Sequence, residues 1–237
     1  CADVTGVQTC ALPISGMLKH IQKVVLLAAL MAASLLVHAS DGDVCSPFKD
    51  GKVDAPLLET MLSAAEDGHL YRIQKSSSQV GFCVDSKLSR IEGRFTDFQG
   101  GMSLAPGEQD DGQTMVLIKA DSLQTKNSLV ESMVKGEHFF DVKHHPEVLF
   151  VSDAFKWTGP DSAVLTGKLT LRGITKAVIF NVTLKALDDE PIDQASRVLV
   201  KATTSIRRAD FGMDELASLV EGNVKLCMSV EALKHES

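Results

Sequence analysis

The chain has 237 residues and a formal net charge of −7 at pH 7. It contains no basic patch with interleaved aromatic residues, and nucleic-acid binding requires a basic surface, so nucleic acid is not an expected partner. Every apolar run is shorter than the ~20 residues that a membrane-spanning helix needs, so no stable membrane insertion is expected. The length fits one folded domain behind two amino-terminal segments.

These two segments are set apart from the folded domain. Residues 1–16 resemble a translated sequencing-adapter oligonucleotide joined to Met17, and we interpret them as a non-native leader. Residues 17–39 are predicted to be a cleaved signal peptide. A short basic segment precedes the apolar run at 24–37, and small or apolar residues stand before Ser40. The predicted location is therefore the periplasm of a Gram-negative bacterium.

Residues 40–68 are predicted to form an amino-terminal extension with one short helix over Pro56 to Glu66, ended by Gly68. The apolar side chains on one side of this helix are Leu57, Leu58, Met61, Leu62 and Ala65. We expect that side to pack against the main domain. Residues 69–237 make up this main domain.

The main domain is predicted to be a series of antiparallel strands. Residues 165–171 and 178–184 alternate between apolar and polar side chains around a turn at Gly173. The predicted strands are 70–75, 79–86, 90–99, 114–121, 146–154, 163–172, 177–186, 197–207 and 223–233. A helix is predicted over 126–135, with a short turn at 136–140. Eight or nine such strands can close on themselves and leave no exposed edge.

Three motifs in the second half of the chain carry a family resemblance. They are FFDV at 139–142 followed by Pro146, LTGKLTLRGITK at 165–176, and IRRADFG at 206–212. Over about residues 69–234 the chain resembles the YceI-like family of lipocalin-like, polyisoprenoid-binding periplasmic proteins. The resemblance implies an all-β fold, a closed antiparallel eight-stranded lipocalin-like barrel with a short N-terminal helix and a helical loop insertion. A barrel of this size can enclose one ligand.

The inward-facing side chains of the predicted strands are almost all hydrocarbon. From the residues alone this face favours a filled core, whereas the family resemblance implies a ligand cavity. Small residues on the same face, such as Gly93 and Gly167, are expected to leave space in the lumen. The predicted ligand-contacting residues are Val80, Phe82, Val84, Phe95, Ile118, Phe150, Leu169, Leu171, Phe180, Val182, Val200, Leu226 and Met228. The predicted residues of the lid or mouth are Met133, Val134, Phe139 and Phe140.

Two departures from the family pattern bear on the ligand's head group. Many members carry a histidine early in the second strand, where this chain has Asp85. They also often carry an Arg-Asp-x-His-Leu run where this chain has the mostly apolar segment 130–134. If those polar residues contact a head group in relatives, this chain is expected to hold a different head group, or the tail alone.

Three disulfide candidates remain after the leader is set aside: Cys45, Cys83 and Cys227. An oxidising compartment permits disulfides, and three thiols allow one bridge and one free thiol. Cys83 and Cys227 each fall on the face opposite their apolar neighbours. Closure of the barrel by its first and last strands would place them side by side on the outer wall. A bridge from Cys45 to either of them is the open alternative. Without a CxxC spacing, a metal-binding or catalytic thiol is the weaker interpretation.

A polar cluster in the middle of the chain raises the question of a metal site or of acid–base catalysis. It comprises His138, Asp141, His144, His145 and Glu147. In an extended segment, His144 and His145 would point to opposite sides and could not easily share one ion. A surface turn is therefore the better interpretation, and no metal site is predicted.

No nucleophile motif is present, so no catalytic residue and no cofactor are predicted, and the chain is not expected to be an enzyme. Arg208 and Asp210 are assigned a structural ion pair or a role in a turn. The predicted function is sequestration of a long isoprenoid or quinone-type lipid for transport, storage or stress protection. One alternative function is a filled barrel that serves as a structural or interaction module. The second alternative is an enzyme acting on a lipid in the cavity through His138 or Asp210. A homodimer is a further open possibility for the assembly state.

Overall fold

The computed structural model describes residues 55–66, 68–104, 112–192 and 194–235. The predicted leader, the predicted signal peptide and Cys45 lie outside the described residues. Within those ranges no helix is long and apolar enough to cross a membrane. The described part consists of a strand barrel with short helices at its periphery.

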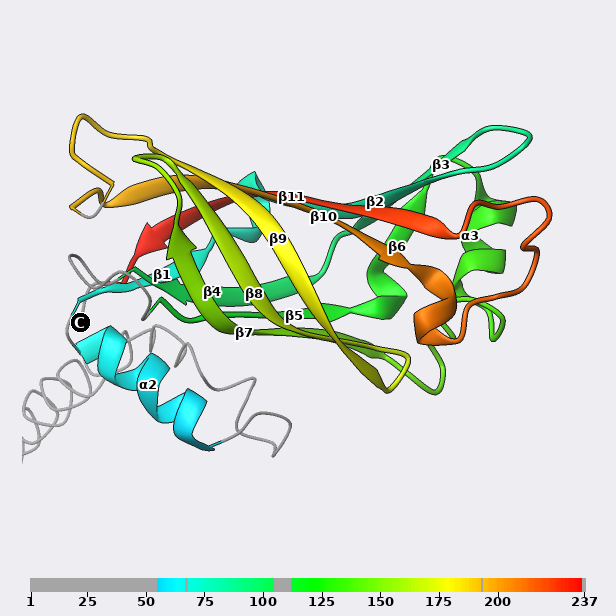
Figure 1. The fold of residues 1–237 in the computed structure, drawn as a ribbon, viewed down its shortest axis with the longest axis horizontal. Coiled ribbons are helices and arrows are strands. Elements are labelled where there is room, and N and C mark those ends of the chain that lie inside the picture. The colour runs from blue at the N-terminus through cyan, green and yellow to red at the C-terminus, as the bar shows by residue number, and fades with distance from the viewer. Residues whose placement is uncertain (1–54, 67, 105–111, 193, 236–237) are drawn as a thin grey trace, which may run out of the picture. The chain divides into compact units, whose positions relative to one another are not determined.

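Eight strands form a closed ring. In spatial order they are β1 (Leu70–Ile73), β4 (Phe98–Ser103), β5 (Thr114–Lys119), β7 (Glu147–Trp157), β8 (Ser162–Leu171), β9 (Ile174–Ala186), β10 (Arg197–Arg207) and β11 (Asn223–Lys234). β1 pairs antiparallel with both β4 and β11, which closes the ring (Figure 1). This confirms the predicted closed antiparallel eight-stranded barrel.

Three shorter strands continue the wall beyond β1, β4 and β5. They are β2 (Gln79–Asp85), β3 (Arg90–Phe95) and β6 (Leu123–Thr125). β11 pairs with β1 at one end of its length and with β2 further along, while β2 pairs with β3 and β3 with β6. Three positions of the eight-stranded wall are thus each built from two consecutive short strands. The 3-10 helices η3 (Lys75–Ser77) and η4 (Ala120–Ser122) separate β1 from β2 and β5 from β6.

The prediction of one continuous strand over 90–99 was wrong, because the structure has two strands there. β3 ends at Phe95 and β4 begins at Phe98. Between them the Thr96 N–H and hydroxyl both donate to the Ser122 carbonyl, and the Asp97 N–H donates to Ser122 Oγ at 3.0 Å. Ser122 therefore accepts hydrogen bonds from the backbone N–H groups of Thr96 and Asp97, which in an unbroken strand would pair with a neighbouring strand.

β7 extends to Trp157, three residues beyond its predicted end at 154. The register with β8 shifts between Ser152 and Ala154, so Asp153 is an extra residue in the strand. Such a bulge exchanges the inward and outward parity of the residues that follow it. The apolar alternation is broken there, which explains why the sequence pattern ended the strand too early.

Helix α2 (Ala55–Glu66) packs on the outer surface of the barrel. Met61 and Ala64 join a cluster with Leu70, Met115 and Leu117. β5 is consequently buried on both faces, because its alternate side chains contact α2 outside and the core inside. The expected packing of the helix is confirmed, but Leu62 was wrongly placed on the packing side, since it is exposed.

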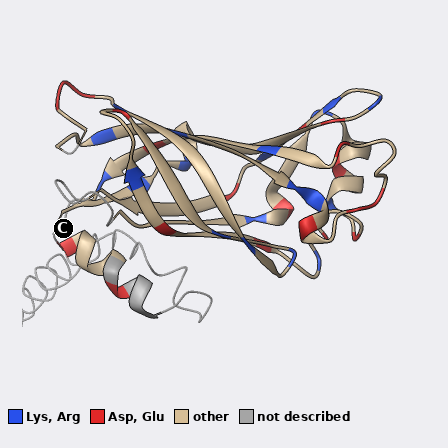
Figure 2. Cartoon of the chain, in the orientation of Figure 1, with Lys and Arg blue, Asp and Glu red and all other residues tan. Residues whose placement is uncertain are grey.

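Charged residues are spread along the strands and loops with both signs mixed (Figure 2). Several form ion pairs on the outer surface, including Lys75 with Asp97 at 2.9 Å and Lys126 with Glu92 at 2.8 Å. Pairs this exposed contribute little to stability. The apolar interior is therefore the principal source of stability in the barrel.

Candidate functional site

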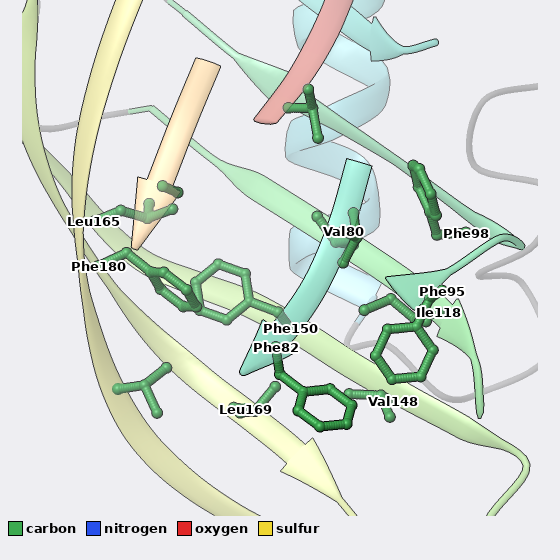
Figure 3. Packing of buried hydrophobic residues seen from close by; sticks show 14 of the residues in the cluster. Val80, Phe82, Phe95, Phe98, Ile118, Val148, Phe150, Leu165, Leu169 and Phe180 are labelled. Carbon is green, nitrogen blue, oxygen red and sulfur yellow. The ribbon is translucent and has the colours of Figure 1, made fainter. Parts of the chain in front are cut away.

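The barrel encloses a cavity lined by side chains from nearly every strand. On β2 the inward positions are Val80, Phe82 and Val84, in the alternation that a strand with one apolar face requires. Figure 3 shows Val80 and Phe82 among residues from β5, β7, β8 and β9. The lining residues are Val80, Gly81, Phe82, Val84, Ile91, Phe95, Val116, Ile118, Met133, Val134, Phe139, Phe140, Val148, Phe150, Leu169, Leu171, Phe180, Ile206, Arg208, Met213, Val220, Val224, Leu226 and Met228.

The open space of this main cavity is about 100 Å³. Arg208 is the single charged residue among the lining residues. Its guanidinium is occupied by backbone carbonyls, as described below, so the surface offered to a ligand is hydrocarbon. Such a wall favours apolar chains and disfavours buried polar groups, which would lose hydrogen bonds to water.

A second, smaller cavity with about 30 Å³ of open space lies further along the lumen. It shares Val80, Val116 and Met228 with the main cavity, so these three side chains form the partition between the two. Of the predicted ligand-contacting residues, Val182 and Val200 line this smaller cavity. The other eleven predicted positions line the main cavity.

The glycines of the inward face do not leave empty space, which corrects the expectation for Gly93 and Gly167. A Cβ at Gly93 would lie 2.3 Å from the Phe82 ring, and one at Gly167 would lie 2.7 Å from the Phe150 ring. Each glycine therefore accommodates an aromatic ring against the wall.

Helix α3 (Ser128–Lys135) and the turn after it close one end of the barrel. Asn127 caps the helix, since its Oδ1 accepts from the N–H groups of Leu129 and Val130. Glu131 accepts from the Thr125 N–H at 3.0 Å and pairs with Lys135. The first contact is the larger cause that holds the pKa of Glu131 below its ordinary value. These contacts anchor α3 to β6.

The predicted lid residues all line the main cavity. Val134 and Phe139 are buried, whereas Met133 is partly exposed at the edge. The Phe140 ring packs on Phe82 and Phe95, with ring centroids 5.5 and 5.7 Å apart. This aromatic group joins the turn to the wall of the lumen, and separating it would widen the cavity toward the outside.

Arg208, at the end of β10, organises the segment 208–222 that completes the same end. Its Nε donates to the Glu221 carbonyl at 3.0 Å, and Nη2 donates to the Val220 carbonyl at 3.2 Å. Nη1 donates to the carbonyls of Met213 and Glu215. The side chain is only 3% exposed. Of the two roles predicted for Arg208, the structure shows the role in a turn, because Arg207 is the residue that pairs with Asp210, at 3.0 Å.

The polar cluster near Asp141 forms the predicted surface turn. Residues 139–145 form turns, with Asp141 at a φ of 48°, and are not extended. His144 Nδ1 lies 2.8 Å from Asp141 Oδ1, and His145 Nε2 lies 3.9 Å from Oδ2. The hydrogen bond from His144 is the largest cause that lowers the pKa of Asp141. The two histidines thus meet on one carboxylate, because the segment is a turn and the opposite orientation of an extended segment does not apply. Among the described residues no group of three or more acidic, histidine or cysteine side chains has metal-site geometry.

Arg172, in the β8–β9 turn, ties the closing segments together. Its Nη2 donates to the Glu137 carbonyl at 3.0 Å, and its Nη1 donates to the Gly212 carbonyl. The end of the barrel formed by α3, residues 136–145 and segment 208–222 is called the α3 end below (right side of Figure 1). Exposed large apolar residues gather there: Leu88, Leu129, Met133, Ile174, Leu216 and Leu219.

Nine residues that line the main cavity are not among the predicted ligand-contacting or lid residues: Gly81, Ile91, Val116, Val148, Ile206, Arg208, Met213, Val220 and Val224. Val116 stands two residues before Ile118 and could have been found from strand parity. Arg208, Met213 and Val220 come from segment 208–222, which has no apolar period. The predicted disulfide candidates Cys83 and Cys227 lie on the outer wall, on the neighbouring strands β2 and β11.

The closed barrel and its apolar cavity define a lipocalin-like β-barrel protein. The family model for the YceI-like domain matches residues 71–232, so the chain belongs to the YceI-like family. It is 32% identical over 171 residues to a UPF0312 protein of Pseudomonas putida strain W619, covering 70% of this chain and 87% of that protein. A UPF0312 protein of Pseudomonas syringae pv. tomato is 32% identical over 135 residues, covering 55% of this chain and 70% of that protein.

Two solved structures share the fold. BcnA of Burkholderia cenocepacia superimposes with a TM-score of 0.61 at 22% identity, covering 67% of this chain and 98% of that chain. A polyisoprenoid binding domain from Saccharophagus degradans superimposes with a TM-score of 0.53 at 16% identity, covering 69% and 98%. At these identities the likeness concerns the fold.

Proposed function

We propose that this protein binds one long-chain isoprenoid or quinone-type lipid in its lumen, in the periplasm, and sequesters it for transport, storage or protection. The observation that carries the proposal is the hydrocarbon lining of the main cavity. Membership of the YceI-like family and the likeness to a polyisoprenoid binding domain support a lipid ligand. The mechanism is binding and release, with no chemical step.

The energetics favour a long tail. Burying ten hydrocarbon carbons yields about 8 kcal/mol at about 0.8 kcal/mol per methylene. Loss of translational and rotational freedom costs several kcal/mol, so micromolar binding needs a longer buried chain. A polyprenyl tail supplies that length, and the smaller cavity beyond Val80, Val116 and Met228 offers further apolar surface for its far end.

The α3 end is the proposed route of access. Its apolar lining continues into the exposed apolar residues Met133, Leu129 and Leu88, which can contact a lipid while it moves from a membrane to the lumen. The tail enters first, and the head group stays among the charged side chains at this end. Because segment 130–134 lacks the polar run common in relatives, a head group here relies on other contacts.

Native mass spectrometry of the full chain purified from a bacterial periplasm, followed by organic extraction, tests the proposal. A prenyl lipid or quinone at one molecule per chain is the expected result. An empty barrel that also fails to bind added polyprenyl phosphate and ubiquinone would contradict it and would favour a filled-core module.

A matched pair of substitutions tests the location of the ligand. Leu169 points into the main cavity, whereas the neighbouring Lys168 is exposed on the outer wall. Leu169→Trp is expected to fill the cavity and weaken lipid binding about tenfold or more, which corresponds to about 1.4 kcal/mol. Lys168→Trp adds the same bulk outside and should leave binding unchanged. Circular dichroism checks that both variants fold, and equal binding by both would place the lipid outside the lumen.

A further inference from the structure

Cys83 and Cys227 are neighbours across the seam between β2 and β11. Cys83 is paired with Lys225, and Cys227 is paired with Gly81, so the two cysteines occupy diagonal positions two residues apart in register. Both point to the outer surface, because the flanking residues of each strand line the lumen. The two side chains therefore lie on the same face of neighbouring strands.

The two sulfur atoms have different surroundings. Arg90 Nη2 donates a hydrogen bond to Cys83 Sγ at 2.7 Å. Attraction to Cys83 is the largest of the causes that raise the pKa of Arg90 above its ordinary value. Burial, followed by the neighbouring Cys83, raises the pKa of the Cys227 thiol. Arg90 contacts Cys83 and not Cys227, and burial acts on the Cys227 thiol, so the two sulfurs are expected to differ in reactivity.

We propose that Cys83 and Cys227 form a redox-active thiol pair, in which Cys83 is the attacking sulfur and Cys227 the resolving one. Cys83 thiolate attacks one sulfur of a small-molecule or protein disulfide, R–S–S–R. The S–S bond of R–S–S–R breaks, and the second sulfur leaves with its R group as the thiolate R–S⁻. Cys227 then gives its proton to solvent and attacks Cys83 Sγ, releasing the second thiolate. The balance is two protein thiols oxidised and one disulfide reduced to two RSH.

The bridge would act on the wall of the barrel. Diagonal positions of an antiparallel pair have Cα atoms about 7–8 Å apart, while disulfides span about 4.4–6.8 Å. Closing the bridge therefore draws β2 and β11 together at a point where Phe82, Val84, Leu226 and Met228 face the lumen. Oxidation links β2 to β11 covalently, and reduction removes that link. The proposal of a thiol pair does not depend on which ligand the lumen binds.

The first experiment uses the full chain, reduced and then equilibrated with glutathione disulfide, followed by peptide mapping. The expected product is one linked peptide pair containing Cys83 and Cys227, with two glutathione molecules released per bridge. Cys227→Ser should stop at glutathione attached to Cys83, with one molecule released. A bridge from Cys45 to Cys83, or the absence of any 83–227 linkage, would overturn the proposal.

The order of attack is tested by alkylation with iodoacetamide at pH 7, followed residue by residue. Cys83 is expected to react about tenfold faster than Cys227. Arg90→Gln should slow Cys83 alkylation by about threefold to tenfold, and Arg90→Lys should restore part of the rate. Arg94→Gln is the matched control, since Arg94 shares the outer face of β3 and contacts Gln124. Equal rates in Arg90→Gln and Arg94→Gln would contradict the role of Arg90.

Discussion

The two ends of the barrel are closed in different ways. At the end opposite α3, called the β9–β10 end, β1 pairs with both β4 and β11, and the buried Tyr71 hydroxyl donates to the Ala195 carbonyl at 2.7 Å. At the α3 end, closure depends on segments outside the strands, held by side chains such as Arg208 and Arg172 that bind backbone carbonyls. Within the described residues, segment 208–222 is joined to the neighbouring strands by only an isolated bridge between Ser86 and Val220 and a few backbone hydrogen bonds, so we expect the α3 end to open more readily than the strand-paired end.

The strongest test of this difference removes the Arg208 side chain. Arg208→Met leaves the carbonyls of segment 208–222 buried without their donors, and is expected to lower the free energy of unfolding by at least about 3 kcal/mol. Arg207→Met is the matched control. Its ion pair with Asp210 is exposed, so the loss should stay within about 0.5 kcal/mol. Urea denaturation measures both, and a similar small loss in the two variants would contradict the organising role of Arg208.

Tyr71→Phe tests the opposite end at a single hydrogen bond. It keeps the buried ring and removes the hydroxyl, leaving the Ala195 carbonyl without this donor. The expected loss in the free energy of unfolding is about 1–1.5 kcal/mol. Hydrogen exchange followed by mass spectrometry should show faster exchange in 187–199 and unchanged exchange in 208–222. Faster exchange at both ends would show that the two closures are coupled.

The alternation of apolar and polar residues predicted the inward-facing positions correctly in strands that have one face in solvent. β2, β8 and β9 alternate cleanly, because their outer residues meet water, and their inward positions were identified from this pattern. In β5 the pattern carries no such information, since α2 covers the outer face and both sets of side chains are buried. The bulge at Asp153 reverses the parity of β7 midway, which a fixed period of two cannot describe.

The α3 end was the least predictable part of the site. The function of Arg208 depends on carbonyls of Met213, Glu215, Val220 and Glu221, which come together only when segment 208–222 folds back on β10. Nothing in the residue types of that segment indicates this arrangement. The lid aromatics were found because the FFDV motif carries the family resemblance, and the apolar period did not contribute.

A pH titration provides the finest comparison of the two ends, because each has a carboxylate whose pKa is lowered. At the α3 end, the hydrogen bond from His144 is the main cause for Asp141, and at the β9–β10 end the hydrogen bond from Ser196 is the main cause for Asp188. A lowered pKa in the folded state stabilises the charged form. The contribution is therefore complete above the ordinary value of about 3.8 and is lost as the pH falls through the lower folded value.

We expect Asp141→Asn to remove the acid sensitivity of residues 139–145 alone, since asparagine tolerates the positive φ of 48° at this position. Asp188→Asn should act in the same way on residues 187–196 alone. Hydrogen exchange from pH 6 to pH 3, corrected for the intrinsic rate, measures both regions in each variant. If either substitution changes the pH dependence of hydrogen exchange in both regions, the two ends are coupled. A movement at the α3 end would then also disturb the β9–β10 end.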